Sequence, residues 1–172
     1  MENYISIAIP TYNSSKYLYD CLKRFVGLNI VNEIIIQDDN SSEKEIKNIK
    51  DILKNINSKK VILHINSENK GAFFNKIEAI SNCNNKWVYQ IDSDNIPSRK
   101  INKDISYVLK TNDPNNLYYP STLYQFYNYP NFSKFLSLFR KKYIVRLFDE
   151  DTLLDINKIK EALLNDKKIT ID

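Results

Sequence analysis

The sequence is poor in several residues on which whole classes of protein depend. It has two Cys and one His among 172 residues, which argues against a disulfide scaffold, a histidine-rich zinc site and a Ser-His-Asp triad. It has neither a Walker-type loop nor a Gly-x-Gly-x-x-Gly loop, which argues against ATPases and dinucleotide-binding enzymes. No apolar run approaches the roughly 20 residues that span a bilayer, and the N-terminus lacks the features of a signal peptide. We therefore expect a cytoplasmic protein in which Cys21 and Cys83 are reduced.

Glycine is equally scarce, with two in the chain. Left-handed turns favour Gly, and Asn and Asp are the residues that tolerate them best after Gly. We therefore expect each Gly at a position whose backbone conformation requires glycine, or else Asn and Asp in the left-handed turns.

The composition is otherwise that of a globular domain. Hydrophobic residues make up 42% of the chain, which is enough to form a core, and the length suits a single domain over residues 1–172. An excess of 25 basic over 21 acidic residues gives a net charge of +4. Because the lysines are scattered along the chain, this charge favours solubility, or an anionic ligand, over a nucleic-acid surface. We expect no nucleic-acid partner.

Short apolar runs alternate with segments of helical periodicity over the first 110 residues. The runs predict strands, and the segments that follow them predict helices; the strands cover residues 4–9, 33–37, 60–65 and 87–91. In the third helix we expect Phe73, Ile77 and Ile80 to face the sheet. This alternation predicts an α/β fold of the Rossmann-like, doubly wound type, with a mainly parallel sheet and helices on both faces.

The pattern is less regular beyond residue 115. A Tyr-rich segment at 117–129 predicts a strand and a turn, and residues 155–165 predict a last helix. Residues 169–172 resemble the beginning of a further element, so we expect a truncated or shortened chain.

Four polar clusters follow the predicted strands. They are Pro10-Thr11-Tyr12-Asn13, Asp38-Asp39-Asn40-Ser41, Asn69-Lys70-Gly71 and Asp92-Ser93-Asp94-Asn95. In an open parallel sheet, the carboxyl ends of the strands meet at one edge, and ligands bind there. We therefore expect these clusters to contribute to one site.

Asp92 and Asp94 are the strongest candidates for a metal site. The Asp-x-Asp pattern alone is weak evidence, because 13 Asp residues make about one copy expected by chance, and Asp149-Glu150-Asp151 is a second copy. The first copy ends an apolar strand, where two converging carboxylates repel each other unless a cation sits between them. Mg²⁺ or Mn²⁺, shared with substrate phosphates, fits this arrangement. The alternative is a helix N-cap before Ile96-Pro97.

The other clusters also have two interpretations each. Asp39 can accept hydrogen bonds from a ribose hydroxyl or a base, or else Asp39 or Ser41 caps the next helix. Thr11 and Tyr12 can line the same pocket, although ordinary packing is an equal alternative for Tyr12. Gly71 begins a helix, where backbone N–H groups can bind a phosphate, or it is a simple turn residue.

Segments 5–13, 34–42 and 89–94 resemble, in order and spacing, the successive motifs of the family 2 glycosyltransferases. The resemblance implies a GT-A fold, a nucleotide-sugar donor that is usually UDP-linked, Mn²⁺ or Mg²⁺ as cofactor, and an inverting transfer. It implies two groups of site residues, assigned here by position. The donor-binding residues are Pro10, Thr11, Tyr12, Asn13, Asp39, Asn69, Gly71, Asn75, Asp92 and Ser93, and the metal ligands are Asp94 and Asp92.

The resemblance also implies individual roles. Asp39 would contact the base, Asp92 the ribose or the metal, and Asp94 the metal and through it the diphosphate. The spacing from Gly71 to Asn75 is shorter than in the family.

The family commonly has an Arg where this chain has Phe74. Lys70 or Lys76 can supply the missing charge. The family's general base follows the metal motif, so the catalytic residue is unassigned here, with Asp149, Glu150 and Asp151 as weak candidates.

By this resemblance, residues 1–110 form the nucleotide-sugar and metal-binding part, and residues 111–172 form a partial acceptor-side part. The acceptor would be a glycan, a lipid-linked molecule or a protein. The aromatic and basic segment 132–148 is either an acceptor-side helix and strand or a contact with an anionic membrane at its cytoplasmic face. The competing functions are a truncated, inactive nucleotide-sugar-binding module and a nucleotidyltransferase, which normally carries a Gly-rich basic loop that residues 10–13 do not provide.

Overall fold

The computed structural model of the chain describes residues 4–111, 122–126 and 142–146. The chain divides into two units, Met1–Asn112 and Asp113–Asp172. In the second unit, β5 (Thr122–Phe126) pairs with β6 (Lys142–Arg146) in antiparallel fashion. β5 lies within the segment for which a strand was predicted. The predicted helix at 155–165, the element beginning at 169 and the candidate bases Asp149, Glu150 and Asp151 lie outside the described residues.

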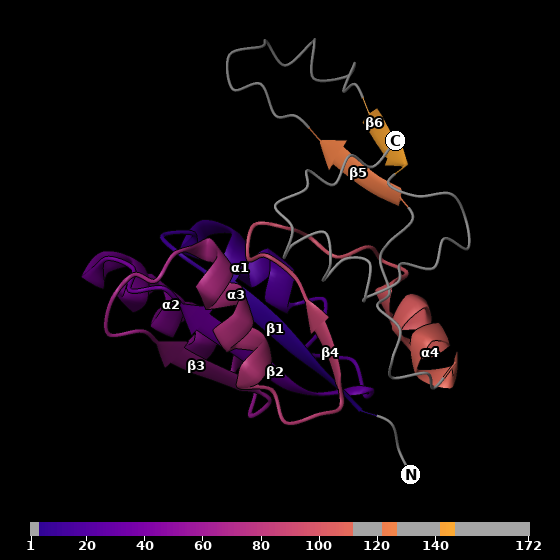
Figure 1. Ribbon diagram of the computed structural model, residues 1–172, viewed down its shortest axis with the longest axis horizontal. Helices are drawn as coiled ribbons and strands as arrows, with labels where there is room; N and C mark the ends of the chain where they lie inside the picture. The colour runs from indigo at the N-terminus through magenta and orange to yellow at the C-terminus, as the bar shows by residue number, and fades with distance from the viewer. Residues whose placement is uncertain (1–3, 112–121, 127–141, 147–172) are drawn as a thin grey trace, which may run out of the picture. The chain divides into compact units, whose positions relative to one another are not determined.

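The first unit alternates strands and helices in the predicted order (Figure 1). Its elements are β1 (Ile5–Thr11), α1 (Ser15–Leu22), β2 (Val31–Asp38), α2 (Glu43–Ile56), β3 (Val61–Ile65), α3 (Ala72–Ser81), β4 (Trp87–Gln90) and α4 (Ile101–Thr111). All four strands are parallel, in the order β3-β2-β1-β4. The predicted parallel α/β sheet is therefore confirmed.

The strand order reverses once. The chain moves outward from β1 to β2 to β3, and then returns to place β4 on the other side of β1. Because crossovers between parallel strands are right-handed, this reversal puts α3 on the opposite face of the sheet from α1 and α2. Consistently, α1 packs against α2, whereas α3 packs on β1 and β2 (Figure 1). The carboxyl ends of β1 and β4 therefore form a topological switch point, where such folds bind ligands.

The two faces of the sheet differ in polarity. Ile5, Ile7 and Ile9 of β1 belong to one buried apolar cluster that includes Leu18, Cys21 and Leu22 of α1, Ile49 of α2, and Ile101, Ile105 and Leu109 of α4. Val31, Ile34 and Ile36 of β2 belong to the same cluster. Because side chains alternate along a strand, the other residues of β1 and β2 point to the opposite face, on which α3 packs. These include the buried polar side chains of Ser6, Glu33 and Gln37.

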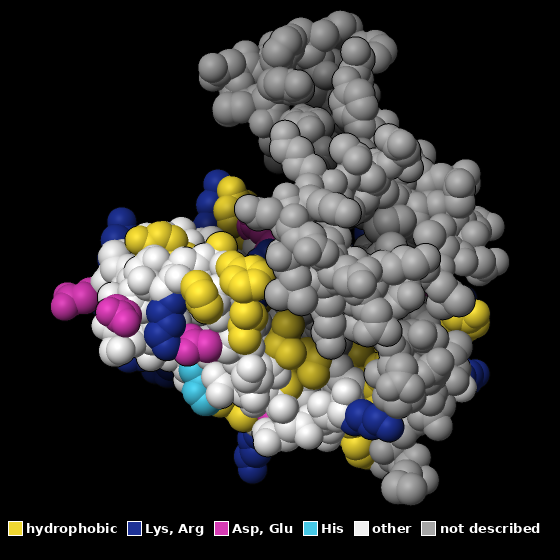
Figure 2. Space-filling model, in the orientation of Figure 1, with side chains coloured by type: hydrophobic (Ala, Val, Ile, Leu, Met, Phe, Trp, Pro, Cys, Tyr) yellow, Lys and Arg dark blue, Asp and Glu magenta, His cyan; other side chains and the backbone are white. Residues whose placement is uncertain are grey.

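The predicted inner face of α3 is wrong. Phe73 is 70% exposed, and Ile77 and Ile80 are also exposed, while Asn75 and Ala79 are buried against the sheet. The physical reason is the polar face of the sheet, which pairs with amide side chains of the helix instead of apolar ones. Figure 2 shows hydrophobic side chains gathered on the molecular surface over α3.

Asparagine supplies most of the left-handed turns, as the scarcity of glycine predicted. The described residues with positive φ are Asn13, Asn40, Asn57 and Gly71. Gly71 has φ 85° and ψ 158°, a conformation that is essentially limited to glycine. Gly71 immediately precedes α3. One of the two glycines is therefore at a position that requires glycine.

Candidate functional site

A pocket of about 210 Å³ lies at the carboxyl ends of β1 and β4, beside the first turns of α3. Its lining brings together the first and last of the predicted polar clusters with part of α3. The lining residues are Pro10, Thr11, Tyr12, Ala72, Asn75, Lys76, Asp92, Ser93 and Asp94. All of them except Ala72 and Lys76 had been assigned to the site from the sequence. Ligand pockets commonly measure about 300–1,000 Å³, so this one has room for only part of a nucleotide-sized molecule.

Asp92 forms an ion pair with Lys76 in this pocket. The ammonium nitrogen of Lys76 lies 2.9 Å from each carboxylate oxygen of Asp92. The amide of Gln90, at the end of β4, donates to Oδ1 of Asp92 at 2.9 Å. Asp92 therefore has its charge balanced by a residue of this chain, a partner that the sequence did not reveal.

Ser93 and Asp94 differ in burial, although both line the pocket. Ser93 is buried and its hydroxyl lies 2.7 Å from that of Ser14, which in turn lies 2.9 Å from the hydroxyl of Thr11. This hydroxyl chain fastens the loop to the end of β1 and leaves Asp94 exposed at the pocket. The next helix begins only at Ile101, so the alternative role of this motif as a helix N-cap is excluded.

Within the described part of the chain, no three His, Cys, Asp or Glu side chains come together as a metal site. A cation at this pocket would have Asp94 and Asp92 as its protein ligands. Water and phosphate oxygens would complete its shell, as is usual for Mg²⁺. The donor set fits such a cation, provided that Asp92 exchanges Lys76 for it.

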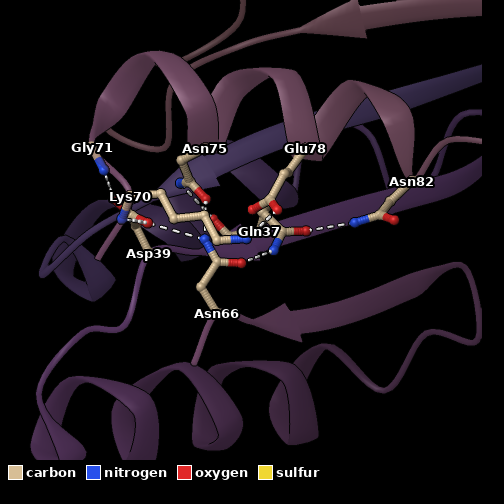
Figure 3. A network of polar contacts seen from close by, with 8 residues as sticks. All are labelled: Gln37, Asp39, Asn66, Lys70, Gly71, Asn75, Glu78 and Asn82. Carbon is tan, nitrogen blue, oxygen red and sulfur yellow. Dashed lines mark hydrogen bonds and ion pairs between the residues drawn. The ribbon is translucent and has the colours of Figure 1, made fainter. Parts of the chain in front are cut away.

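Asp39 does not line the pocket. It is 2% exposed, and its carboxylate accepts hydrogen bonds from the backbone N–H groups of Lys70 and Gly71, both at 2.9 Å, and from the Asn66 amide at 3.0 Å (Figure 3). The N–H of Gly71 also donates to Oδ1 of Asn69 at 3.1 Å. The backbone groups considered for a phosphate are thus already bonded to side chains of this chain.

Asn13 also has a local partner. Its backbone N–H donates to the Ser41 hydroxyl at 2.8 Å, and its side-chain oxygen accepts from the backbone N–H of Ser42 at 3.1 Å. Asp38 in turn accepts from the N–H and the hydroxyl of Ser41. Asn13 therefore joins the loops that follow β1 and β2.

Asn75 connects the pocket to the sheet. Its amide donates to the backbone carbonyls of Gln37 at 3.0 Å and Thr11 at 3.4 Å, and its oxygen accepts from Asn66 at 3.2 Å. Gln37 extends the network by donating to Asn66 and accepting from Asn82, as Figure 3 shows. The buried amide thus fixes the ends of β1 and β2 against α3.

The cysteines do not serve as nucleophiles here. Both are free, and neither lines the pocket. Burial, and then the nearby charge of Asp94, raise the pKa of Cys21 to about 12, and burial and the charge of Glu33 raise the pKa of Cys83 to about 11. The thiols are therefore protonated near neutral pH, as free cysteines without a catalytic role are.

The sheet order and the carboxylates at its switch point define the class of GT-A α/β folds. S. aureus TarS, residues 1–349, superposes with a TM-score of 0.53 at 21% identity, over 63% of this chain and 32% of that one. The mannosyltransferase PcManGT from Pyrobaculum calidifontis superposes with a TM-score of 0.56 at 16% identity, over 67% and 34% of the two chains.

Residues 6–158 match the family model described as glycosyl transferase family 2, so the chain belongs to this family. A curated relative from Methanococcus voltae is 35% identical over 86 residues, which are 48% of this chain and 26% of the relative. It is named dolichyl N-acetyl-alpha-D-glucosaminyl phosphate 3-beta-D-2,3-diacetamido-2,3-dideoxy-beta-D-glucuronosyltransferase. The match thus spans about a quarter of that relative's length. No helix in the described residues has the length and apolar character needed to cross a membrane.

Proposed function

We propose that this protein is a glycosyltransferase that moves a sugar from a UDP-sugar to an acceptor hydroxyl with inversion. The observation that carries the proposal is that Asp92 and Asp94 share one pocket with Thr11 and Tyr12 at the switch point of the sheet. Family membership supports the transfer reaction. TarS in complex with UDP-GlcNAc and PcManGT in complex with GDP-Man and Mn²⁺ support a nucleotide-sugar donor.

The pocket residues have distinct roles in this proposal. Asp94 and Asp92 hold Mn²⁺ or Mg²⁺ together with the donor diphosphate. The exposed ring of Tyr12 stacks on the base, and Asn75 keeps the ends of β1 and β2 in register beneath the ligand. When bound, the cation stabilises the charge that develops on the departing diphosphate. Asp39 acts on the donor through the loop that it holds, from Asn69 to Gly71.

The acceptor hydroxyl attacks the anomeric carbon from the face opposite the diphosphate, which inverts that centre. A carboxylate must take the hydroxyl proton, and Asp149, Glu150 and Asp151 remain the candidates for this base. The name of the archaeal relative describes a dolichyl-linked substrate, which favours a lipid-linked acceptor over a glycan or a protein. Such an acceptor would be met at the cytoplasmic face of a membrane.

Calorimetric titration with UDP and GDP, each with Mn²⁺ and with EDTA, tests the donor site. We expect UDP to bind in the presence of Mn²⁺, and Asp94→Asn to weaken this binding at least tenfold, or about 1.4 kcal/mol, because one metal ligand is lost. Asp51→Asn removes the same charge from the exposed surface of α2 and is the matched control.

The outcomes separate the candidate functions. Failure of the wild-type protein to bind UDP with Mn²⁺ present would contradict the proposal. Binding without release of UDP from a panel of UDP-sugars, with acceptor present, would instead indicate a nucleotide-sugar-binding module. Inversion is tested by the anomeric configuration of the product in proton NMR.

A further inference from the structure

Lys76 is one of the two lysines that the sequence offers in place of the family's Arg, and it is the one that lines the pocket. It lies on the second turn of α3, and its side chain is 39% exposed. Phe74, at the position where the family commonly has Arg, is 60% exposed and does not line the pocket. We propose that Lys76 binds the diphosphate of the donor, and that it rests on Asp92 until the donor arrives. This inference rests on the proposed function, because it presumes a nucleotide ligand.

The charges of the pocket support this role. Its lining, taken from the described residues, contains two carboxylates and the single ammonium of Lys76, which leaves a net charge of −1. A nucleotide-sugar diphosphate carries a charge of about −2. Without Lys76, a bound divalent cation would only neutralise the two carboxylates. With Lys76, the pocket that holds the cation has a net positive charge. The lysine thus converts a neutral site into one that attracts the donor.

The other possible phosphate donors in this region are already engaged. The N–H groups of Lys70 and Gly71, at the N-terminal end of α3, donate to Asp39. The side chain of Lys70 is paired with Glu78, away from the pocket lining. Of the two lysines that flank this turn, Lys76 is therefore the one whose charge faces the candidate site.

The geometry of the ion pair also allows Lys76 to leave Asp92 when a donor binds. Both carboxylate oxygens of Asp92 lie 2.9 Å from the ammonium, so Asp92 cannot coordinate a cation fully while it holds Lys76. A lysine ammonium is a compact charge on a flexible four-carbon stem, so it can move within the pocket without a backbone change. Asp92 would turn to the cation and Lys76 to the diphosphate in the same exchange.

The test compares Lys76→Gln with Lys23→Gln. Lys23 is an exposed lysine paired with Asp20 on α1, outside the pocket lining, so both variants lose one charge and one ion pair. Calorimetry with UDP in EDTA and in Mn²⁺, and with uridine, supplies the readout. We expect Lys76→Gln to weaken UDP binding about tenfold in Mn²⁺ and to change it less in EDTA, where Lys76 stays on Asp92. Uridine binding should be unchanged, because only the diphosphate contact is lost. Lys23→Gln should bind both ligands as the wild type does.

Each other outcome has a distinct meaning. If wild-type protein binds no nucleotide, the proposed function fails before this inference is tested. If it binds UDP and Lys76→Gln binds UDP equally well, Lys76 is only the counter-ion of Asp92, and the inference is wrong. An equal loss for uridine and UDP would also overturn it, because that loss would come from a disturbed pocket. Lys76→Arg, which keeps the charge, should stay within about threefold of wild type for UDP; a loss as large as that of the Gln variant contradicts a charge contact.

Discussion

Asp39 is a buried acidic residue whose carboxylate closes the loop leading into α3. Its oxygens accept from the backbone N–H groups of Lys70 and Gly71 and from the amide of Asn66. A carboxylate is acceptor-only, and each of its three partners here is a donor. The geometry therefore specifies an acid at this position for reasons of local structure, in addition to any contact with a base.

Replacing this acid with its amide tests that role. In Asp39→Asn, one acceptor oxygen becomes an NH₂ group that faces protein donors, so at least one of the three hydrogen bonds to this side chain is lost. We expect the free energy of unfolding to fall by about 2 kcal/mol, measured by urea denaturation. Asp51→Asn, on the exposed surface of α2, should change it by less than about 0.5 kcal/mol. Equal stabilities for the two variants would mean that the loop does not depend on Asp39.

Single residues show what the sequence could and could not predict. Asn13, Asn40 and Asn57 adopt left-handed backbone conformations, as expected when glycine is scarce, because this preference is local. The partners of Asp39 and Asp92 could not be predicted. Apart from the bond from Gln90 to Asp92, each bond joins residues that are distant in the sequence. Its existence depends on how the loop after β3 and α3 come to lie against the sheet.

Among the elements, α3 departs most from expectation. Helical periodicity indicated an apolar inner face at Phe73 and Ile77, yet Asn75 and Ala79 are buried. The sequences of the strands already indicate a polar partner for this helix. Ser6 alternates with isoleucines in β1, and Gln37 follows the isoleucine run of β2. These positions predict that one face of the sheet is more polar than the other. An apolar helix face could not satisfy the buried amide of Gln37, whereas Asn82 does.

The start of α3 depends on one glycine, and the second glycine provides the control. Gly71 has φ 85° with nothing within 4 Å of an added Cβ, so the cost of Gly71→Ala is backbone strain and not a clash. We expect a loss of about 1–3 kcal/mol in the free energy of unfolding. Gly27 has equal space and no positive φ, and Gly27→Ala should leave stability unchanged or raise it by less than about 1 kcal/mol. Urea unfolding of both variants measures the difference. Equal free energies of unfolding would show that α3 can begin without the positive φ of Gly71.

Over the whole molecule, the fold class was predictable and the strand order was not. Alternation of apolar runs and helical segments is a local signal, and it led to a parallel α/β sheet with the clusters at one edge. The position of β4 beside β1, which creates the switch point and the pocket, depends on long-range pairing between Ile5–Ala8 and Trp87–Gln90. The division of the chain into donor-side and acceptor-side parts stays a prediction.

The opposite end of the sheet has a titratable group that links β2 to β1 and to the turn before β4. Glu33 of β2 is buried, and it accepts from the Ser6 hydroxyl of β1 and from the backbone and side chain of Asn84, just before β4. Burial raises the pKa of Glu33, but the hydrogen bonds from Ser6 and Asn84 outweigh it, so the pKa lies below its usual value. The charged form is therefore the one that the folded protein prefers.

This preference predicts how global stability depends on pH. Because the folded-state pKa of Glu33 is depressed, its contribution is present above the unfolded value of about 4.3 and is lost as the pH falls through the folded value. We expect Glu33→Gln to lower the free energy of unfolding by about 1–2 kcal/mol at pH 6, and this difference from wild type to shrink as the pH falls below the unfolded value of about 4.3. Urea denaturation across this range measures it, with Glu68→Gln, an exposed carboxylate, as the control for lost charge. A difference that stays constant until the protein unfolds in acid would mean that the charge of Glu33 does not hold these segments together.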